Sequence, residues 1–415
     1  MCKRFYLLTL VLASLLSALP TCAAQEAAWV ESADTAWYEN DREASEYAID
    51  TPEELAGLSV LVGSGDAEGA KVNFNGKTIR LAKDIDLSGR TWTSIGCGYG
   101  SFQGVFDGRG HTIEGLGTVT PFDEEGWSNG YGLFGRVSGR QAVVKNINLR
   151  GRVVASGDKC FSLGAVAGRI DQKAVIENCV FSGVLKGFSG AAIGGIVGHN
   201  NSGSVRSCSV SADIATGAAN PEEAKKTRIG GIVGCYECYD VGPSIENSIF
   251  TGSIRYKDGS ASMRVGGIAG ENFWASCIIQ NCAVSADIDV SGGTSPFGYD
   301  QWINCAGGAA GYNGGTINNV AVTGSVKLHA DDAQNDVAAG GACRSKRLRT
   351  EHPHRKQLAQ LHSLGFKPER RKNLGGRDSG LQLRILVVSP SEPRHDNQQP
   401  LGQKEGSAES SGRKL

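Results

Sequence analysis

The chain has 415 residues, 58 of them glycine, and its formal net charge is −1 at pH 7. The charge is unevenly distributed, because residues 343–415 contain sixteen Lys and Arg against seven Asp and Glu, which leaves 26 basic and 36 acidic residues in the remainder. No stretch after residue 24 is long and apolar enough to form a helix that crosses a bilayer, so we expect no membrane span. We also expect no nucleic-acid partner.

The first 24 residues have the pattern of a secretory signal peptide. Two basic residues precede an apolar run over 5–19, and small residues follow at 22–24. Cleavage is expected near Ala24, and the mature protein is expected to be secreted or held at the cell surface. The two residues before Cys22 match a lipoprotein signal poorly, so lipid anchoring is the less favoured alternative.

Residues 25–48 are polar and acidic, and we interpret them as a linker. The next segment predicts a helix, because Thr51 stands at an N-cap position, Pro52 at the first helical position, and Glu54 completes a capping box. This helix and the strands after it, over residues 49–120, are expected to cap one end of a repeat domain.

A glycine-rich block of five residues recurs along residues 121–341. Its clearest copies read Gly-Gly-Ile-Val-Gly or a close variant, and they lie at Gly164–Gly168, Gly194–Gly198, Gly230–Gly234, Gly266–Gly270 and Gly307–Gly311. Self-similarity at a spacing of a few tens of residues is typical of a solenoid, in which each repeat packs only on its neighbours.

A second segment, such as Ile176-Glu177-Asn178-Cys179, accompanies each repeat. Its six copies lie at 144–147, 176–179, 205–208, 245–248, 279–282 and 317–320. From the fourth position apolar and polar residues alternate, which predicts a strand with one buried face. The third inward position is always Gly or Ala, which suits a bend or a close backbone approach, and the Asn is expected at a corner that bonds along the stack.

These patterns predict an all-β fold. Rungs stacked in register would form a right-handed parallel β-helix, with a short capping helix at the N-terminus and an irregular C-terminal tail. An antiparallel all-β array is the alternative. It is disfavoured because hairpins would not require both segments to repeat in register.

The glycine block together with Ile-Glu-Asn-Cys resembles the GLUG-motif repeat of bacterial surface and secreted proteins. The resemblance covers residues 49–341 and includes leader segments at 51–58, 77–81, 84–89, 92–96, 106–113 and 132–135. It implies a secreted or surface-exposed β-helix, often adhesive. The repeat also occurs beside the protease domain of IgA-specific metalloendopeptidases, but this chain has no His-Glu-x-x-His motif, so that activity is not expected here.

The repeat breaks off after Gly341, and residues 342–415 predict a basic, disordered tail. We interpret this tail as out-of-frame. Permitted codons for His354–Leu358, read one nucleotide later, encode Ile-Glu-Asn-Ser, and the same shift over Leu374–Gly380 permits a glycine block. A genuine tail that binds anionic surfaces is the alternative. The last rung would then lack a cap and could self-associate.

The cysteines predict buried thiols and no metal site. Cys179, Cys208 and Cys282 occupy equivalent inward positions, where identical orientation gives a poor disulfide dihedral. Cys235 and Cys238 form a Cys-x-x-Cys, which could be a local disulfide, a redox pair or half of a metal site. No second such motif or His pair completes a zinc site, so we expect no metal.

The sequence contains little that points to catalysis. The Gly-x-Gly runs lie in strands rather than before a helix, so no phosphate or dinucleotide cofactor is expected. The outward strand face is mostly Ser, Thr, Ala and Asn, and its carboxylates are interpreted as solvated. We therefore expect no enzyme. A β-helix enzyme that acts on polysaccharides through Asp, Lys and Arg is the alternative.

A histidine and several aromatic residues follow the glycine blocks. The candidate ligand-binding residues are His199, Tyr236, Tyr239, Trp274 and Tyr312. Aligned along one edge of the stack, they would suit sugar rings or a peptide, although they could simply pack one loop on the next. The function expected is a binding or adhesion module for a glycan or protein of a host or cell surface. A structural stalk that presents a missing C-terminal domain is a further alternative.

Overall fold

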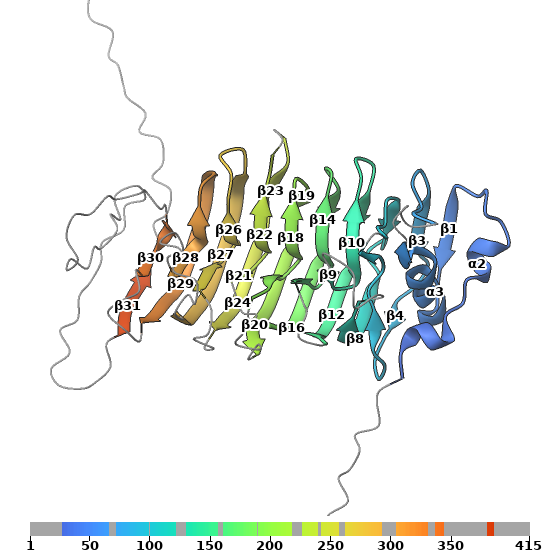
Figure 1. Ribbon diagram of the computed structural model, residues 1–415, viewed down its shortest axis with the longest axis horizontal. Helices are drawn as coiled ribbons and strands as arrows, with labels where there is room; N and C mark the ends of the chain where they lie inside the picture. Colours follow the sequence, from blue (N-terminus) through green and yellow to red (C-terminus); the bar gives the residue numbers. More distant parts are fainter. Residues whose placement is uncertain are drawn as a thin grey trace, which may run out of the picture.

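The computed structural model describes residues 27–65, 72–98, 100–121, 130–156, 161–188, 190–217, 226–239, 242–256, 262–292, 304–330, 337–343 and 380–385. The signal peptide predicted for 1–24 lies outside these residues, as does most of the predicted tail. The described strands stack along one axis, with the helices at the N-terminal end (Figure 1).

Two long sheets form the stack. The first contains two ladders of mainly parallel strands (Figure 1). One ladder consists of β1 (Glu46–Ile49), β3 (Thr78–Leu81), β7 (Val105–Asp107), β11 (Val143–Lys145), β15 (Val175–Glu177), β19 (Ser204–Arg206) and β23 (Ser244–Glu246). The other consists of β4 (Ile85–Asp86), β5 (Trp92–Thr93), β8 (Thr112–Thr120), β12 (Asn148–Ala155), β16 (Val180–Phe188), β20 (Ser209–Gly217) and β24 (Ile249–Tyr256). Both ladders continue into the longer β27 (Ile278–Gly292) and β29 (Thr316–Ala330).

The second sheet holds the glycine blocks, and in most rungs a short strand lies on either side of a bend in the block. The strands that enter the bends are β9 (Gly130–Tyr131), β13 (Ser162–Gly164), β17 (Ala192–Gly194), β21 (Lys226–Gly230) and β25 (Ser262–Gly266). Those that leave are β10 (Phe134–Ser138), β14 (Ala167–Asp171), β18 (Val197–Asn201), β22 (Val233–Glu237) and β26 (Ala269–Asn272). β28 (Asn304–Asn313) joins both rows and pairs with β30 (Val337–Cys343), and a separate two-stranded sheet is formed by β2 (Ser64–Gly65) and β6 (Cys97–Gly98).

Neighbouring rungs pair parallel and in register, which confirms the predicted parallel β-helix. β16 pairs with β20 from Val180↔Ser209 to Phe188↔Gly217 without a slip. The predicted inward positions are buried, since Cys179, Phe181 and Leu185 are fully covered within one rung. The core lies inside the coil, because in-register stacking places each apolar side chain on its counterpart in the next rung.

The corner residue of each rung adopts a left-handed backbone conformation. Its φ lies between +48° and +56° in all six copies, which are Asn146, Asn178, Ser207, Asn247, Asn281 and Asn319. Asn is the non-glycine residue that tolerates this region best. The predicted corner is therefore confirmed, and the tight turn between two strands explains why the Asn recurs.

The small third inward residue marks a close backbone approach between rungs, as predicted. Gly183 has φ = +147°, and a Cβ built on it would lie 1.9 Å from the carbonyl oxygen of Gly151 in the preceding rung. No side chain fits this contact unless the backbone moves.

The predicted helix is present as α3 (Pro52–Val62), and its capping box is formed. The Thr51 Oγ1 accepts from the Glu54 amide at 3.1 Å, and a Glu54 carboxylate oxygen accepts from the Thr51 amide at 3.2 Å. One face of the helix is buried, at Leu55, Leu58 and Val62.

The structure differs from the linker predicted for residues 25–48. From residue 27 onward this segment forms η1 (Trp29–Ser32), α2 (Ala36–Glu39) and β1. β1 pairs with β3 and so belongs to the first sheet. Trp29 and Tyr47 are buried, and Trp37 packs against the core. These few aromatic residues anchor a segment whose overall composition is polar, because each aromatic ring buries a large apolar area.

Two parts of the predicted tail are strands among the described residues. β30 extends to Cys343, and β31 (Gly380–Ile385) pairs antiparallel with β29. The described residues contain no helix that is both long enough and apolar enough to span a bilayer.

Candidate functional site

The residue that directly follows each glycine block forms a column across the second sheet. The strand register pairs its members from rung to rung, in the order Arg136, Arg169, His199, Cys235, Glu271 and Tyr312. We call this set the post-glycine column. Its members are polar or ionisable in every rung, whereas the neighbouring positions are mostly apolar or glycine.

At the N-terminal side of the column, a buried carboxylate lies between two arginines. Asp171 Oδ2 lies 2.9 Å from Arg136 Nε, and Asp171 Oδ1 lies 2.9 Å from an Arg169 guanidinium nitrogen. Asn201 donates to the same carboxylate at 3.0 Å. Burial alone would raise the pKa of Asp171, but the bonds and charges of the two arginines outweigh it, so the pKa lies below its ordinary value.

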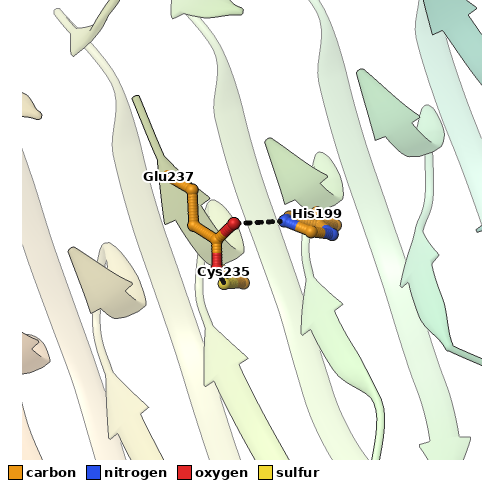
Figure 2. Close-up of side chains that lie close together, drawn as sticks. All are labelled: His199, Cys235 and Glu237. Carbon is orange, nitrogen blue, oxygen red and sulfur yellow. Dashed lines mark hydrogen bonds and ion pairs between the residues drawn. The ribbon is translucent and has the colours of Figure 1, made fainter. Parts of the chain in front are cut away.

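The centre of the column brings together a histidine, a thiol and a carboxylate (Figure 2). His199 comes from β18, and Cys235 and Glu237 come from β22, two residues apart and therefore on the same strand face. His199 Nε2 lies 3.5 Å from Glu237 Oε2, and Cys235 Sγ lies 3.8 Å from Glu237 Oε1. The adjacent His199 is the main cause of a lowered pKa at Glu237, whereas burial raises the pKa of Cys235.

The next carboxylate, Glu271, is covered and ion-paired. Arg228 on β21 and Arg264 on β25 both contact it, and only 1% of its side chain is exposed. Burial disfavours the charged form of both arginines and so acts to lower their pKa. At Arg228 the neighbouring Cys235 and Glu271 outweigh burial, and the pKa is raised. At Arg264 burial is the larger effect, and the pKa is lowered. Cys235 Sγ also lies 3.8 Å from Glu271 Oε2, so the thiol lies between two carboxylates.

The column ends in an aromatic cluster. The Arg264 guanidinium lies 4.0 Å from the centre of the Tyr312 ring, which in turn lies 6.1 Å from the Phe273 ring. Trp274 meets Phe273 edge-on, with 4.6 Å between the ring centres, and its ring centre lies 5.6 Å from that of Tyr239. We call these four residues, Tyr239, Phe273, Trp274 and Tyr312, the aromatic edge. Tyr239 is 65% exposed and Trp274 41% exposed, so two rings of neighbouring rungs face solvent together.

The structure places the predicted ligand-binding residues in three different settings. Tyr239, Trp274 and Tyr312 lie in the aromatic edge, as the predicted row of rings requires. His199 lies in the post-glycine column beside Cys235 and Glu237 instead. Tyr236 is fully buried, and its hydroxyl donates to the Pro243 carbonyl at 2.8 Å. Tyr236 therefore presents no exposed surface for the ligand contact that we predicted.

Tyr236 is buried because it lies one residue beyond the strand position that pairs with His199. Tyr236 pairs with Asn200 and Asn272, not with His199, and a shift of one position turns a side chain to the opposite face of a strand. Asn200 and Asn272, which pair with Tyr236, point to this same face. Asn200 bonds the backbone of Gly203, and both Asn200 and Asn272 are fully buried.

Sequence reasoning also missed the ionisable residues that meet in the column, above all Glu237, Glu271, Arg228 and Arg264. A strict alignment of the glycine blocks would have found part of this set, because Arg169, His199, Cys235 and Glu271 all occupy the same position after a block. The Cys-x-x-Cys is not a disulfide, since both cysteines are free. Cys238 belongs to the hydrophobic core, whereas Cys235 faces the ionisable cluster.

The comparison with protein families supports the resemblance of the repeats. The family model described as the GLUG motif matches residues 189–215, which span one glycine block, one corner and one alternating strand. Residues 189–215 therefore carry a GLUG motif. The other rungs stack on the matched one in the same register, so the geometry of the motif extends beyond the matched residues.

More distant comparisons add little. No curated protein matches the chain. A crystal structure from Bacteroides ovatus, provisionally assigned as an immunoglobulin A1 protease, is similar at 17% sequence identity and a TM-score of 0.43. That similarity covers 72% of this chain and 84% of the other, and it is too weak to carry an argument about function.

Proposed function

We propose that this GLUG-motif β-helix is a non-catalytic binding module of a secreted or cell-surface protein, and that the aromatic edge contacts the sugar rings of a glycan. The secreted location rests on the signal-peptide pattern of the first 24 residues.

The exposed pair of rings carries the proposal. Tyr239 and Trp274 come from consecutive rungs, their ring centres lie 5.6 Å apart, and both are exposed. Phe273 packs against Trp274, and Tyr312 packs against Phe273. Adjacent exposed aromatic faces give a large contact area for flat, partly apolar surfaces such as sugar rings, and they lose little entropy on binding because few bonds rotate.

The setting of the carboxylates favours binding over polysaccharide cleavage. The Asp171 side chain is 4% exposed and that of Glu271 is 1% exposed, and each is paired with two arginines. Hydrolysis of a glycosidic bond generally uses a pair of carboxyl groups that flank the scissile bond. Neither of these two buried groups can do so, so their role in the column is structural.

The proposal is tested by replacing the exposed rings and probing an oligosaccharide and polysaccharide array with the full chain. We expect Tyr239→Ala and Trp274→Ala each to weaken binding to the retained glycans. The loss for the double variant is expected to be about thirtyfold or more, because one central aromatic anchor typically accounts for about 2 kcal/mol.

Ile249→Ala is the matched control, since Ile249 is 48% exposed and lies on β24, in the other sheet. It should leave binding unchanged. If the double variant is folded, by its circular dichroism spectrum, and binds every retained glycan as the unmodified chain does, the aromatic edge is not the ligand site. That result would favour the stalk or simple loop packing.

A further inference from the structure

The cluster at His199, Cys235 and Glu237 has the composition of a transition-metal site. Its three donor atoms, one nitrogen, one sulfur and one carboxylate oxygen, all lie within 4.8 Å of one another. They point toward a common space between β18 and β22 (Figure 2). Imidazole, thiolate and carboxylate are the side chains that bind zinc in proteins.

The separations of the donor atoms agree with one shared ion. Zinc bonds of about 2.0–2.1 Å to N and O and about 2.3 Å to S place tetrahedral donors roughly 3.3–3.6 Å apart. His199 Nε2 lies 3.5 Å from Glu237 Oε2, and Cys235 Sγ lies 3.8 Å from Glu237 Oε1. A ring nitrogen of His199 and Cys235 Sγ lie within 4.8 Å of each other, so side-chain rotation would have to bring these two atoms to the tetrahedral separation.

An unsatisfied polar atom provides a second, independent indication. His199 Nε2 is buried and has no hydrogen-bond partner among the described residues, since its approach to Glu237 is an ion-pair contact of 3.5 Å. A buried polar atom without a partner is costly and rare in folded proteins. A bond to a metal ion would satisfy this nitrogen.

The surrounding charges suit a divalent cation held by these three residues. Arg228 and Arg264 pair with Glu271, so Glu271 is already neutralised and is not available as a ligand. Glu237 retains its negative charge, and Cys235 would add a second one when its thiol proton passes to solvent on binding. The side chains of His199 and Glu237 are each 24% exposed, which leaves a path for the ion and room for a water ligand.

We propose that His199 Nε2, Cys235 Sγ and a carboxylate oxygen of Glu237 bind one zinc ion, with water in the fourth position. The ion would tie two consecutive rungs of the stack together across the β18–β22 pair. This site is distinct from the aromatic edge, and the proposal does not depend on glycan binding.

The experiment uses the full chain, stripped of metal with a chelator and then titrated with zinc in competition with a chromophoric chelator. We expect one tight site per chain. His199→Gln, Glu237→Gln and Cys235→Ser should each weaken it by at least about tenfold. Titration with cobalt should give a thiolate charge-transfer absorption that is lost in Cys235→Ser.

His329→Gln is the matched control. His329 Nε2 lies 2.9 Å from Asp289, so this variant removes a histidine from another histidine–carboxylate pair, in the first sheet. It should bind zinc as the unmodified chain does. His199→Gln alters a partly exposed side chain and keeps the proposal testable if Cys235→Ser does not fold. Absence of tight binding, or equal binding by all three ligand variants, would overturn the proposal and leave the cluster as an ion-pair network.

Discussion

At the scale of single residues, the corner asparagine determines the shape of each rung. The side chains also bond along the stack, because Asn178 Nδ2 donates to Asn146 Oδ1 at 2.6 Å and Asn319 Nδ2 donates to Asn281 Oδ1 at 2.8 Å. Ser207 interrupts this ladder at one rung but keeps the left-handed backbone, with φ = +52°. The backbone conformation is therefore the stricter requirement, and the amide ladder adds to it.

Substitutions of Asn178 separate these two contributions. Asn178→Gly keeps the left-handed backbone and loses the exposed hydrogen bond from the Asn178 side chain to Asn146. We therefore expect the free energy of unfolding to fall by about 0.5 kcal/mol. Asn178→Ala should cost about 1 kcal/mol more, because an alanine is strained in this conformation. Urea unfolding of the full chain, followed by circular dichroism, measures both. Equal losses for Gly and Ala would show that the backbone conformation is not the stricter requirement.

At the scale of strands, charged side chains in and beside the post-glycine column join one rung to the next. The carboxylate of Asp171 on β14 contacts Arg136 on β10 and Asn201 on β18. Glu271 on β26 similarly joins β21 and β25 through their arginines. Parallel in-register strands bring like charges together, as at Arg136 and Arg169. A carboxylate shared by the two arginines offsets their repulsion.

The ion pairs of Asp171 predict a defined pH dependence of stability. Its pKa is lowered by folding, so the carboxylate stabilises the folded state above the ordinary pKa of about 3.9, and this contribution is lost as the pH falls through the folded value. We expect Asp171→Asn to be about 2 kcal/mol less stable than the unmodified chain at pH 7.

The difference in free energy of unfolding between the unmodified chain and Asp171→Asn should shrink on acidification below about pH 4. Chemical unfolding at several pH values measures it, and the other acidic residues cancel in the comparison because both proteins carry them. A gap that stays constant down to the lowest pH at which both proteins fold would mean that Asp171 does not stabilise the fold through its charge.

At the scale of the whole molecule, the stack has two ends that must be protected. At the N-terminal end, α3 buries its apolar face, and its Ser59 hydroxyl donates to the Thr93 carbonyl at 2.8 Å. At the other end, β31 pairs with β29 only from Gly324 to His329. Self-association through the remaining edge of the last rung stays a prediction, since open strand edges pair readily.

Removal of the N-terminal cap should expose the first rung. We expect a chain that lacks residues 49–65 to form soluble oligomers or aggregates, because the edge and the apolar surface under α3 become accessible. Size-exclusion chromatography with light scattering measures the mass. Val60→Ser, on the exposed side of the same helix, should elute as the unmodified chain does. A monomeric deletion variant would show that α3 is not needed as a cap.

Particular residues show how far the sequence could lead. The Gly-or-Ala position of Gly183, the corner of Asn178 and the capping box of Thr51 and Glu54 were all predictable, since each depends on contacts within a rung or with the identical neighbouring rung. The buried Tyr236 was not, because aromatic character does not reveal which face of a strand a residue occupies when the register is one residue in error.

The sequence by itself therefore determined the rung and its stacking, because periodic burial and special backbone conformations repeat within each copy. Only the tertiary structure decided which side chains of different rungs meet. His199 and Glu237 lie 38 positions apart, on the strands β18 and β22 of neighbouring rungs, so their 3.5 Å contact depends on strand register and not on any local pattern. Functional chemistry that spans two rungs is set by this register.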